Sequence, residues 1–242
     1  YADGGDDADI WAGLAELGVP ALLVPEAQGG IGLNPLDAAI VAESLGAHTT
    51  PSPFLGTAVM APTALVASGG NHDDLLAEIA AGTHRVGIAF SEAIKRRNDA
   101  RVEARDSRLF GKSLFAFDAD ADSYLVADQN KHLYLVAAQD PGLTRTHLTT
   151  VDKTRRTVEL TYDDVAAQCI STDIGVFKRV LDIGRVAIAA DTLGAAQNML
   201  DQAVAYAKQR EQFNRPIGSF QAVKHMCAEM AAQLEPCRSM VW

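Results

Sequence analysis

The chain has few cysteines and no long apolar run. Three cysteines occur among its 242 residues, Cys169, Cys227 and Cys237, and no two of them form a CxxC pair. This odd number and wide spacing predict reduced thiols in a cytoplasmic protein. No apolar run reaches the roughly 18 residues that a membrane-spanning helix needs, and no signal peptide is visible. We therefore expect no membrane span.

Basic residues are in the minority. The chain has 21 Lys and Arg against 31 Asp and Glu, which gives a net charge of −10 at pH 7. An acidic balance argues against general nucleic-acid binding, although local basic groups can still bind the phosphates of a nucleotide. The composition, 48% hydrophobic and 21% charged, is that of a soluble globular protein. The length allows one large domain or two small ones.

Several common functional motifs are also missing. The glycines between Val24 and Gly32 form neither GxGxxG after a strand nor the GxxxxGK[ST] phosphate loop. We interpret them as loop glycines at positive φ. No GxSxG elbow or Cys–His pairing is present, and the six histidines lack the spacing of metal ligands. The sequence therefore predicts no metal site and no Ser or Cys nucleophile.

Hydrophobic spacing divides the chain into three parts and predicts an α+β fold. Residues 1–84 show helical periodicity, and we expect helices near 8–17, 36–45, 59–66 and 73–80. Residues 85–166 contain short runs rich in β-branched and aromatic residues, separated by Asp, Gly and Asn. The strands predicted there are 85–90, 108–117, 123–127, 132–137 and 155–161. Residues 167–242 are helical again and form the third domain.

The third part predicts long helices. A helical pattern of about forty residues begins at Asp173, with a stripe that contains small residues such as Ala190 and Gly194 and so allows close helix contact. A second helix is expected from Phe220 to about Trp242. Two such helices need partners to bury their stripes, which predicts an incomplete C-terminal long-helix bundle and an oligomer. Since Tyr1 is not a methionine and Trp242 ends inside a helical pattern, we expect a longer chain.

The segment between the two long helices is predicted to be a helix break. Asn214 to Gly218 contains Pro216, which disfavours the helical conformation of the residue before it. Ser219 is expected to cap the next helix with its hydroxyl group.

Functional side chains gather around this break. Arg210 and Phe213 are spaced to share one face of the last helical turn, with Gln221 and Lys224 just beyond the break. A guanidinium, an aromatic ring, an amide and an ammonium are therefore expected beside a helix N-terminus, which favours anions. This combination predicts a clamp for a nucleotide diphosphate. His225 follows Lys224 and is a weaker candidate for the same site.

Four separate motifs resemble the acyl-CoA dehydrogenase family. The pattern Arg-x-x-Phe-x-x-Pro-Ile-x-x-x-Gln-Ala-x-x-x-x-x-Ala at 210–228 is similar to its flavin-binding helix junction. Val-Pro-Glu-x-x-Gly-Gly-x-Gly at 24–32 is similar to a connection in its N-terminal domain. Residues 152–156 and 162–165 resemble its landmarks for the end of the β-domain and the return to helix. The resemblance implies that fold: an all-α domain, a β-domain and a long-helix bundle.

The resemblance also implies a cofactor. In the family, residues of the helix junction reach across a subunit interface and hold the pyrophosphate and adenine of the neighbour's FAD. The positions of this chain implied to bind FAD are Arg210, Gln212, Phe213, Ile217, Phe220, Gln221 and Lys224.

The chain's own flavin pocket departs from the family pattern. A Thr-Glu-x-x-x-Gly-Ser-Asp segment is expected after the first strand, but here Ser91-Glu92 leads into Lys95-Arg96-Arg97-Asn98. A later strand usually carries a Thr or Ser that bonds the flavin N5, whereas Phe117 fills that place and cannot donate a hydrogen bond. Phe115 and Phe117 are expected to be core residues. Ser91 and Glu92 remain candidates to line an acyl-CoA groove.

The catalytic base is missing from one of its two family positions. The family reaction removes an α-proton and a β-hydride from an acyl-CoA, which requires a carboxylate over Cα. On the first long helix Gly184 occupies the Glu position, and Asp182 lies about 200° around the helix. The second family position, on a late loop, lies beyond Trp242. Glu211, Glu229 and Glu235 are expected on solvated helix faces.

These departures favour a subunit of a heteromeric, FAD-dependent acyl-CoA dehydrogenase. The implied partners are a homologous subunit in an α2β2 assembly, an acyl-CoA substrate and electron-transfer flavoprotein as acceptor. A steroid-derived CoA thioester is suggested only by resemblance to such α2β2 members. Two alternatives stay open: a homotetrameric enzyme with its Glu beyond Trp242, and a structural or regulatory homologue that binds no flavin.

Overall fold

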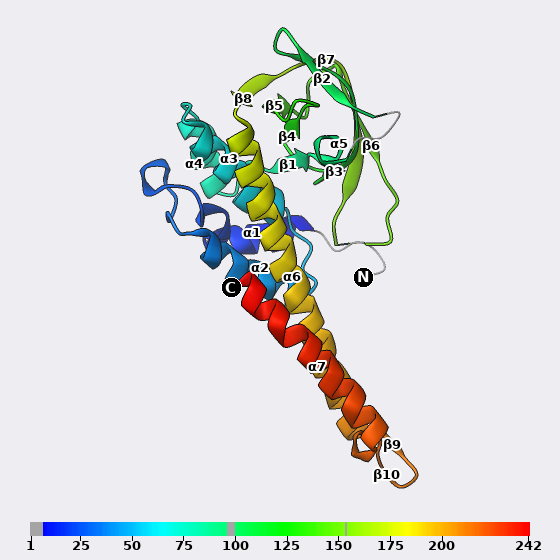
Figure 1. Ribbon diagram of the computed structural model, residues 1–242. Helices are drawn as coiled ribbons and strands as arrows, with labels where there is room; N and C mark the ends of the chain where they lie inside the picture. Colours follow the sequence, from blue (N-terminus) through cyan, green and yellow to red (C-terminus); the bar gives the residue numbers. More distant parts are fainter. Residues whose placement is uncertain (1–6, 96–99, 153) are drawn as a thin grey trace. The chain divides into compact units, whose positions relative to one another are not determined.

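The computed structural model describes residues 7–95, 100–152 and 154–242. The chain divides into two compact units, which are described separately. Unit 1 comprises Tyr1–Pro35 and Pro51–Gly184, and unit 2 comprises Leu36–Thr50 and Arg185–Trp242. None of the helices in the described residues is long and apolar enough to cross a membrane. Figure 1 shows the order of the elements along the chain.

Helices make up the first part of unit 1. They are α1 (Asp7–Glu16), the 3-10 turns η1 (Val19–Ala21) and η2 (Glu26–Gln28), the π-helix η3 (Leu55–Met60), α3 (Ala61–Ser68) and α4 (Asp73–Ala80). Gly18 follows α1 with a φ of 77°, a left-handed conformation that costs glycine little. The predicted helices are confirmed, and α4 has the expected bounds.

An eight-stranded sheet makes up most of the rest of unit 1. Its strands are β1 (Val86–Ala89), β2 (Val102–Arg105), β3 (Arg108–Phe117), β4 (Ser123–Ala127), β5 (Leu133–Ala137), β6 (Leu143–His147), β7 (Thr157–Ala166) and β8 (Gln168–Ser171). Their order is β6-β7-β3-β1-β4-β5-β8, and β2 pairs with β3 outside this path. The β1–β4 pair is parallel, and the other pairs are antiparallel. The short helix α5 (Ser91–Ile94) follows β1.

Residues 162–165 were predicted to mark a return to helix, and this prediction is wrong. They belong to β7, where Tyr162 and Val165 are buried against the neighbouring β3. The sheet then continues through β8, which pairs with β5, and the next helix begins at Ile174. These residues therefore pair with β3, and the return to helix that the family resemblance implied here comes later in the chain.

The sheet of unit 1 is covered by hydrophobic side chains. One buried cluster joins η3, α3 and α4 to β1, β4 and β5, and it includes Met60 and the first turns of α6. A second cluster is built from the strands and includes Tyr124 and Tyr162. The buried Thr57 hydroxyl accepts a hydrogen bond from the Val86 backbone N–H at 2.9 Å, which ties η3 to β1.

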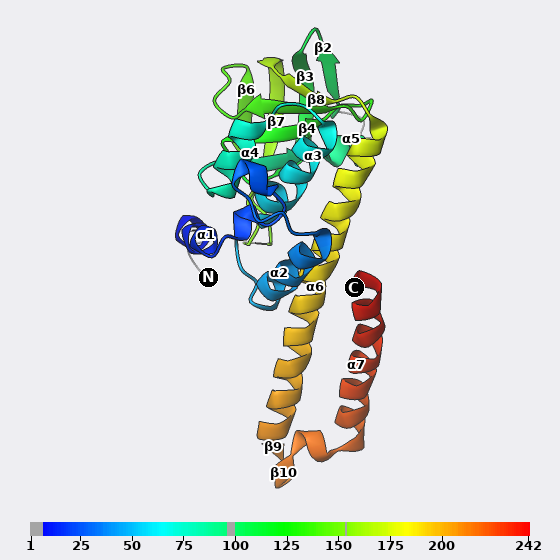
Figure 2. The ribbon, with the colours of Figure 1, turned by 90° about the vertical axis from the view of Figure 1, so that its left-hand side faces the viewer.

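Unit 2 contains the long helices. Helix α6 (Ile174–Gln209) begins in unit 1 and continues through unit 2, and α7 (Gln221–Val241) runs back alongside it, as Figure 2 shows. Helix α2 (Pro35–Ala47) packs against α6. A Cβ atom at Gly194 would lie 1.9 Å from the Glu43 carbonyl oxygen, and one at Gly46 would lie 1.9 Å from that of Asp191. The expected close contact through small residues is therefore confirmed.

Candidate cofactor-binding hairpin

The segment between α6 and α7 is a small β-hairpin. Helix α6 ends at Gln209, before Arg210, so the prediction that Asn214 to Gly218 breaks the helix is wrong. The strands β9 (Glu211–Gln212) and β10 (Arg215–Pro216) pair antiparallel, and the 3-10 turn η4 (Ile217–Ser219) leads into α7. In a longer helix the Arg210 carbonyl would accept a helical hydrogen bond. In the hairpin it accepts one from the Ile217 N–H at 2.7 Å instead.

Two residues form the turn of the hairpin. Phe213 has a φ of 53° and Asn214 a φ of 61°. Positive φ at both central residues is the geometry of a type I′ turn, whose twist suits an antiparallel pair. Asn tolerates this conformation, but a bulky residue such as Phe adopts it rarely. Phe213 therefore does not share a helical face with Arg210, and the expectation that it does is wrong.

Aromatic and cationic side chains surround this turn. The ring of Phe213 is 86% exposed and meets the ring of Phe220 edge-on, with centroids 6.1 Å apart at 81°. The guanidinium of Arg215 lies 4.0 Å from the centroid of the same Phe220 ring. These contacts fix the orientation of Phe220 between two partners, although the surface around it is open.

The other sequence-predicted residues also lie on this hairpin or at the start of α7. Arg210, Gln212, Gln221 and Lys224 are exposed, and Ile217 is half-buried. The Gln212 amide donates to the Glu211 carbonyl at 2.9 Å. Within the described part of the chain, Arg210 and Lys224 make no ion pair. The hairpin thus presents two cations that make no ion pair among the described residues and the exposed ring of Phe213, which suits a phosphate-bearing ligand with an aromatic base.

Ser219 does not cap α7. The N-cap residue is Phe220, whose side chain makes no capping hydrogen bond. Ser219 instead ends η4, whose last hydrogen bond runs from Phe220 N–H to the Ile217 carbonyl at 3.1 Å. The amide groups of the first turn of α7 are left for solvent or a ligand.

A side chain at the position implied for the catalytic base would meet the Met60 side chain. Gly184 is buried in α6, and a Cβ atom there would lie 2.8 Å from the Met60 sulfur and 3.1 Å from its Cε. Met60 belongs to the buried cluster around η3. The space in front of position 184 is therefore filled by a hydrophobic side chain of the same unit. Asp182 is exposed, as expected.

Glu92 is a buried structural carboxylate. Its Oε1 accepts a hydrogen bond from the Leu114 backbone N–H at 3.0 Å, and its Oε2 accepts one from the Ser91 hydroxyl at 2.6 Å. The bond with Leu114 ties α5 to β3. Residues 96–98, where the family's Gly-Ser-Asp is missing, lie outside the described residues.

Phe115 and Phe117 differ in burial. Phe115 is 46% exposed, so the expectation that it is a core residue is wrong. The pairing of β3 with β7 changes register between Ser113 and Ala116, so simple alternation does not assign the faces of this stretch. Phe117 packs against the buried cluster, as expected. It also lines a cavity of about 40 Å³ together with Ser52, Pro53, Arg85, Asp118 and Arg155, among others.

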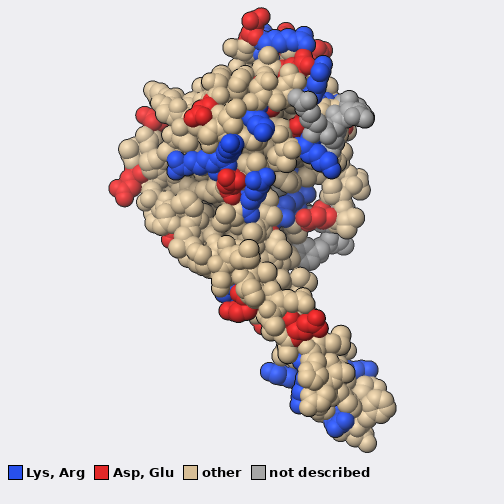
Figure 3. Space-filling model, viewed as in Figure 1, with Lys and Arg blue, Asp and Glu red and all other residues tan. Residues whose placement is uncertain are grey.

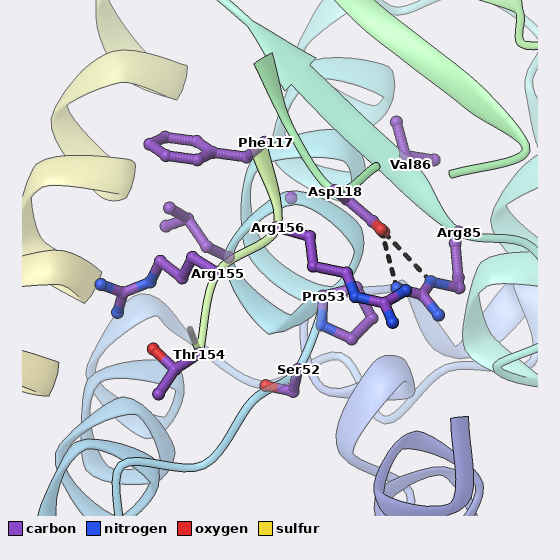
Figure 4. A pocket seen from close by; sticks show the side chains of 11 residues that line it. Ser52, Pro53, Arg85, Val86, Phe117, Asp118, Thr154, Arg155 and Arg156 are labelled. Atoms are coloured by element: carbon purple, nitrogen blue, oxygen red, sulfur yellow. Dashed lines mark hydrogen bonds and ion pairs between the residues drawn. The ribbon is translucent and has the colours of Figure 1, made fainter. Parts of the chain in front are cut away.

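This cavity is too small for a flavin ring. A volume of about 40 Å³ holds a few water molecules, whereas sites for drug-sized ligands measure roughly 300–1,000 Å³. Figure 4 shows Arg85 directed at Asp118, with N–O distances of 2.7 and 3.1 Å, while Arg155 extends away from Arg85. Both residues of this ion pair line the cavity. Among the described residues, no group of His, Cys, Asp or Glu could hold a metal ion.

The sequence did not predict a role at the site for Arg215 or for Met60. Arg215 lies two residues after Phe213, but its role depends on the hairpin register, which helical spacing does not reveal. Met60 lies 124 positions before Gly184, and no local pattern signals that contact.

Comparisons with known proteins place this geometry in context. Residues 1–83 match the family model described as "Acyl-CoA dehydrogenase, N-terminal domain", and residues 174–242 match "Acyl-CoA dehydrogenase, C-terminal domain". Acyl-CoA dehydrogenase IpdE2 of Mycobacterium tuberculosis is 33% identical over 247 residues, covering 99% of this chain and 66% of that protein. The chain thus spans just under two thirds of that relative's length.

Solved structures agree with these matches. A variant of the steroid ACAD Tcur3481-Tcur3483 superposes with a TM-score of 0.88 at 30% identity, covering 99% of this chain and 68% of that one. The ChsE4-ChsE5 complex from Mycobacterium tuberculosis gives a TM-score of 0.84 at 25% identity, covering 97% and 67%.

Proposed function

The chain belongs to the acyl-CoA dehydrogenase family, and from this premise we propose that it is one subunit of a heteromeric, FAD-dependent acyl-CoA dehydrogenase. The reaction is the α,β-dehydrogenation of an acyl-CoA thioester. This chain lends residues of its hairpin to a flavin that a homologous partner subunit holds. The residues 1–84, 85–166 and 167–242 would form its helical domain, its β-domain and the beginning of its bundle domain.

One observation carries this proposal: the hairpin is equipped for a nucleotide, while the position for the base is filled. Arg210 and Phe213 are exposed around a turn of fixed shape. Met60 occupies the space in front of Gly184, where the family's first-helix Glu would stand. A chain that binds a phosphate-bearing cofactor but holds no base on this helix fits a shared site better than an independent one.

Two of the similar structures support the heteromeric arrangement and the class of substrate. The Tcur3481-Tcur3483 protein is named a steroid ACAD, and ChsE4-ChsE5 is named a complex. By analogy, we propose an α2β2 assembly and a steroid-derived CoA thioester as substrate. Electron-transfer flavoprotein is the proposed acceptor. Three cysteines that are free in the structure fit the proposed cytoplasmic location.

The residues of this chain would act by binding and orienting. Arg210 and Lys224 would neutralise the phosphates of FAD, since guanidinium and ammonium groups make strong charge-assisted hydrogen bonds to phosphate oxygens. Phe213, Ile217 and Phe220 would offer apolar contact to the adenosine part, and Gln212 and Gln221 would donate amide hydrogens. When bound, FAD supplies the hydride acceptor. The base that removes the α-proton would belong to the partner subunit.

The visible absorption spectrum tests this proposal. We would purify the chain alone and together with its homologous neighbour, and compare flavin absorbance and dehydrogenase activity. The proposal expects both only in the co-purified sample, and expects Arg210→Ala to remove the flavin from it. Bound FAD with activity in the lone chain would instead favour the self-sufficient enzyme. No flavin in either sample would favour a structural homologue.

A further inference from the structure

The register of the hairpin sorts its side chains onto two faces. Arg215 is opposite Gln212, and Pro216 is opposite Glu211. Residues directly opposite each other in an antiparallel pair lie on the same face, and residues two apart along a strand do so too. The bond from Ile217 N–H to the Arg210 carbonyl extends the pairing by one position.

One face of the hairpin is therefore cationic. It carries Arg210, Gln212, Arg215 and Ile217, three of which are implied to bind FAD by the family resemblance. The other face carries Glu211, which is the single acidic residue between positions 202 and 228. In the view of Figure 3, basic and no acidic side chains are visible around the hairpin end of unit 2. Glu211 therefore lies on the face opposite that of Arg210 and Arg215.

Arg215 is held in place without being neutralised. Its guanidinium lies 4.0 Å from the centroid of the Phe220 ring, and the edge-on contact with Phe213 supports that ring from another direction. Among the described residues Arg215 makes no ion pair, so its charge and its N–H groups stay available. A stacked guanidinium loses less side-chain entropy when it binds a ligand than a free one does.

We propose that Arg215 is a further phosphate-binding residue of this hairpin, which together with Arg210 grips the diphosphate of the FAD held by the partner subunit. This inference rests on the proposed function. Two guanidinium groups on one face match the two phosphates of a diphosphate, and each can form paired N–H···O bonds. Phe220 then acts as a positioning residue, because it orients Arg215.

Binding of FAD to the flavin-free complex tests this proposal. We would measure the FAD dissociation constant by fluorescence for the wild type and for Arg215→Ala, Arg215→Lys and Arg215→Gln. ADP, which carries the diphosphate without the flavin ring, serves as a competing probe. Lys208→Ala is the matched control, because Lys208 is an exposed cation at the end of α6, next to the hairpin, and it makes no ion pair with any residue that the structure describes.

The proposal expects Arg215→Ala to weaken FAD binding by about tenfold to a hundredfold, as for the loss of a charge-assisted bond. ADP should lose affinity by the same factor. Arg215→Lys should retain only part of the wild-type affinity, because an ammonium group lacks the planar, bidentate geometry of a guanidinium. Lys208→Ala should change binding by less than about threefold, as expected of a screened surface charge. If the Arg215→Ala complex does not assemble, the FAD dissociation constant of Arg215→Gln tests the loss of the charge in its place.

Two results separate this inference from the proposed function. If Arg215→Ala and Lys208→Ala have equal, small effects while Arg210→Ala loses FAD, Arg215 is not a phosphate ligand and the proposed function stands. If Arg210→Ala also keeps FAD, the hairpin does not hold the cofactor and both proposals fail.

Discussion

The sulfur of Met60 lies 2.8 Å from the point where Gly184 would carry a Cβ atom. Both residues are buried, Met60 in η3 and Gly184 in α6. A long side chain at position 184 must displace Met60 from the packed cluster around it. The thioether end of Met60, a flexible side chain, therefore has to shift before a carboxylate fits at this position.

Gly184→Glu should destabilise the protein without creating an active base. Overpacking a close-packed core costs about 1–3 kcal/mol, and an unpaired buried carboxylate adds to that cost. Urea denaturation followed by circular dichroism would measure the change. The double variant Gly184→Leu, Met60→Ala isolates the steric contribution to this loss of stability. This pair should be more stable than the sum of the two single variants predicts. Strict additivity would show that the two side chains do not compete for space.

The contact between α2 and α6 should not tolerate a methyl group. In Gly194→Ala and Gly46→Ala the new Cβ would meet a backbone carbonyl oxygen at 1.9 Å, so the two helices must separate. We expect each variant to lower the free energy of unfolding by about 1–3 kcal/mol or more, despite the higher helix propensity of alanine. Thermal melting of the helical signal would measure this loss.

Gly13 provides the control for these variants. It lies in α1, and among the described residues a Cβ atom there would meet no atom within 4 Å outside its own helix backbone. Gly13→Ala should therefore stabilise the protein by about 0.5–1 kcal/mol through helix propensity alone. If Gly13→Ala and Gly194→Ala shifted the melting temperature in the same direction, the close contact would be in doubt.

Burial explains which strands the sequence predicted. The five predicted strands correspond to β1, β3, β4, β5 and β7, which all lie inside the sheet. The three that were missed are β2, β6 and β8, which lie at its edges. Edge strands are half-solvated and carry polar residues, as in the Leu-Thr-Arg-Thr-His run of β6, so their hydrophobic alternation is weak.

The candidate site was predicted in composition but not in geometry. Motif matching singled out Arg210 and Phe213, but their placement was derived from helical spacing, which the structure contradicts. A Phe-Asn turn is hard to predict, because type I′ hairpins usually contain Asn-Gly or Asp-Gly. The pairing of Arg215 with Gln212 follows only from that turn.

The turn itself can be tested at Asn214. Its φ of 61° suits glycine at no steric cost, so Asn214→Gly should keep the hairpin and FAD binding. Asn214→Val should disrupt the turn, because a β-branched residue at positive φ is strained by about 1–2 kcal/mol or more. The FAD dissociation constant of the complex would measure both effects. Equal affinities for the two variants would contradict the role of the turn.

Stability should fall at alkaline pH. Burial is the main cause that raises the pKa of Tyr162, whose hydroxyl lies 3.1 Å from the Ser113 hydroxyl. Above pH of about 10 the unfolded chain loses this proton while the folded chain keeps it, so rising pH favours unfolding. The pKa values of Tyr124 and Tyr134 are raised as well, also chiefly by burial.

Tyr162→Phe separates this effect from the others. The variant should lose about 1–3 kcal/mol at neutral pH, because Ser113 stays buried without its partner. Its stability should then decline less steeply than that of the wild type above pH of about 10. Urea denaturation at a series of pH values would compare the two slopes. Parallel curves would show that Tyr162 ionises freely in the folded state.

The flavin content of the assembled complex tests the shared site most directly. The amount of each subunit is measured from its band on a denaturing gel, and the amount of cofactor from the absorbance of the FAD released from the complex. A subunit that lends its hairpin to a partner's flavin predicts one FAD for each pair of different subunits, and no FAD in a complex that carries Arg210→Ala. One FAD on every subunit, kept by the Arg210→Ala variant, would contradict the account.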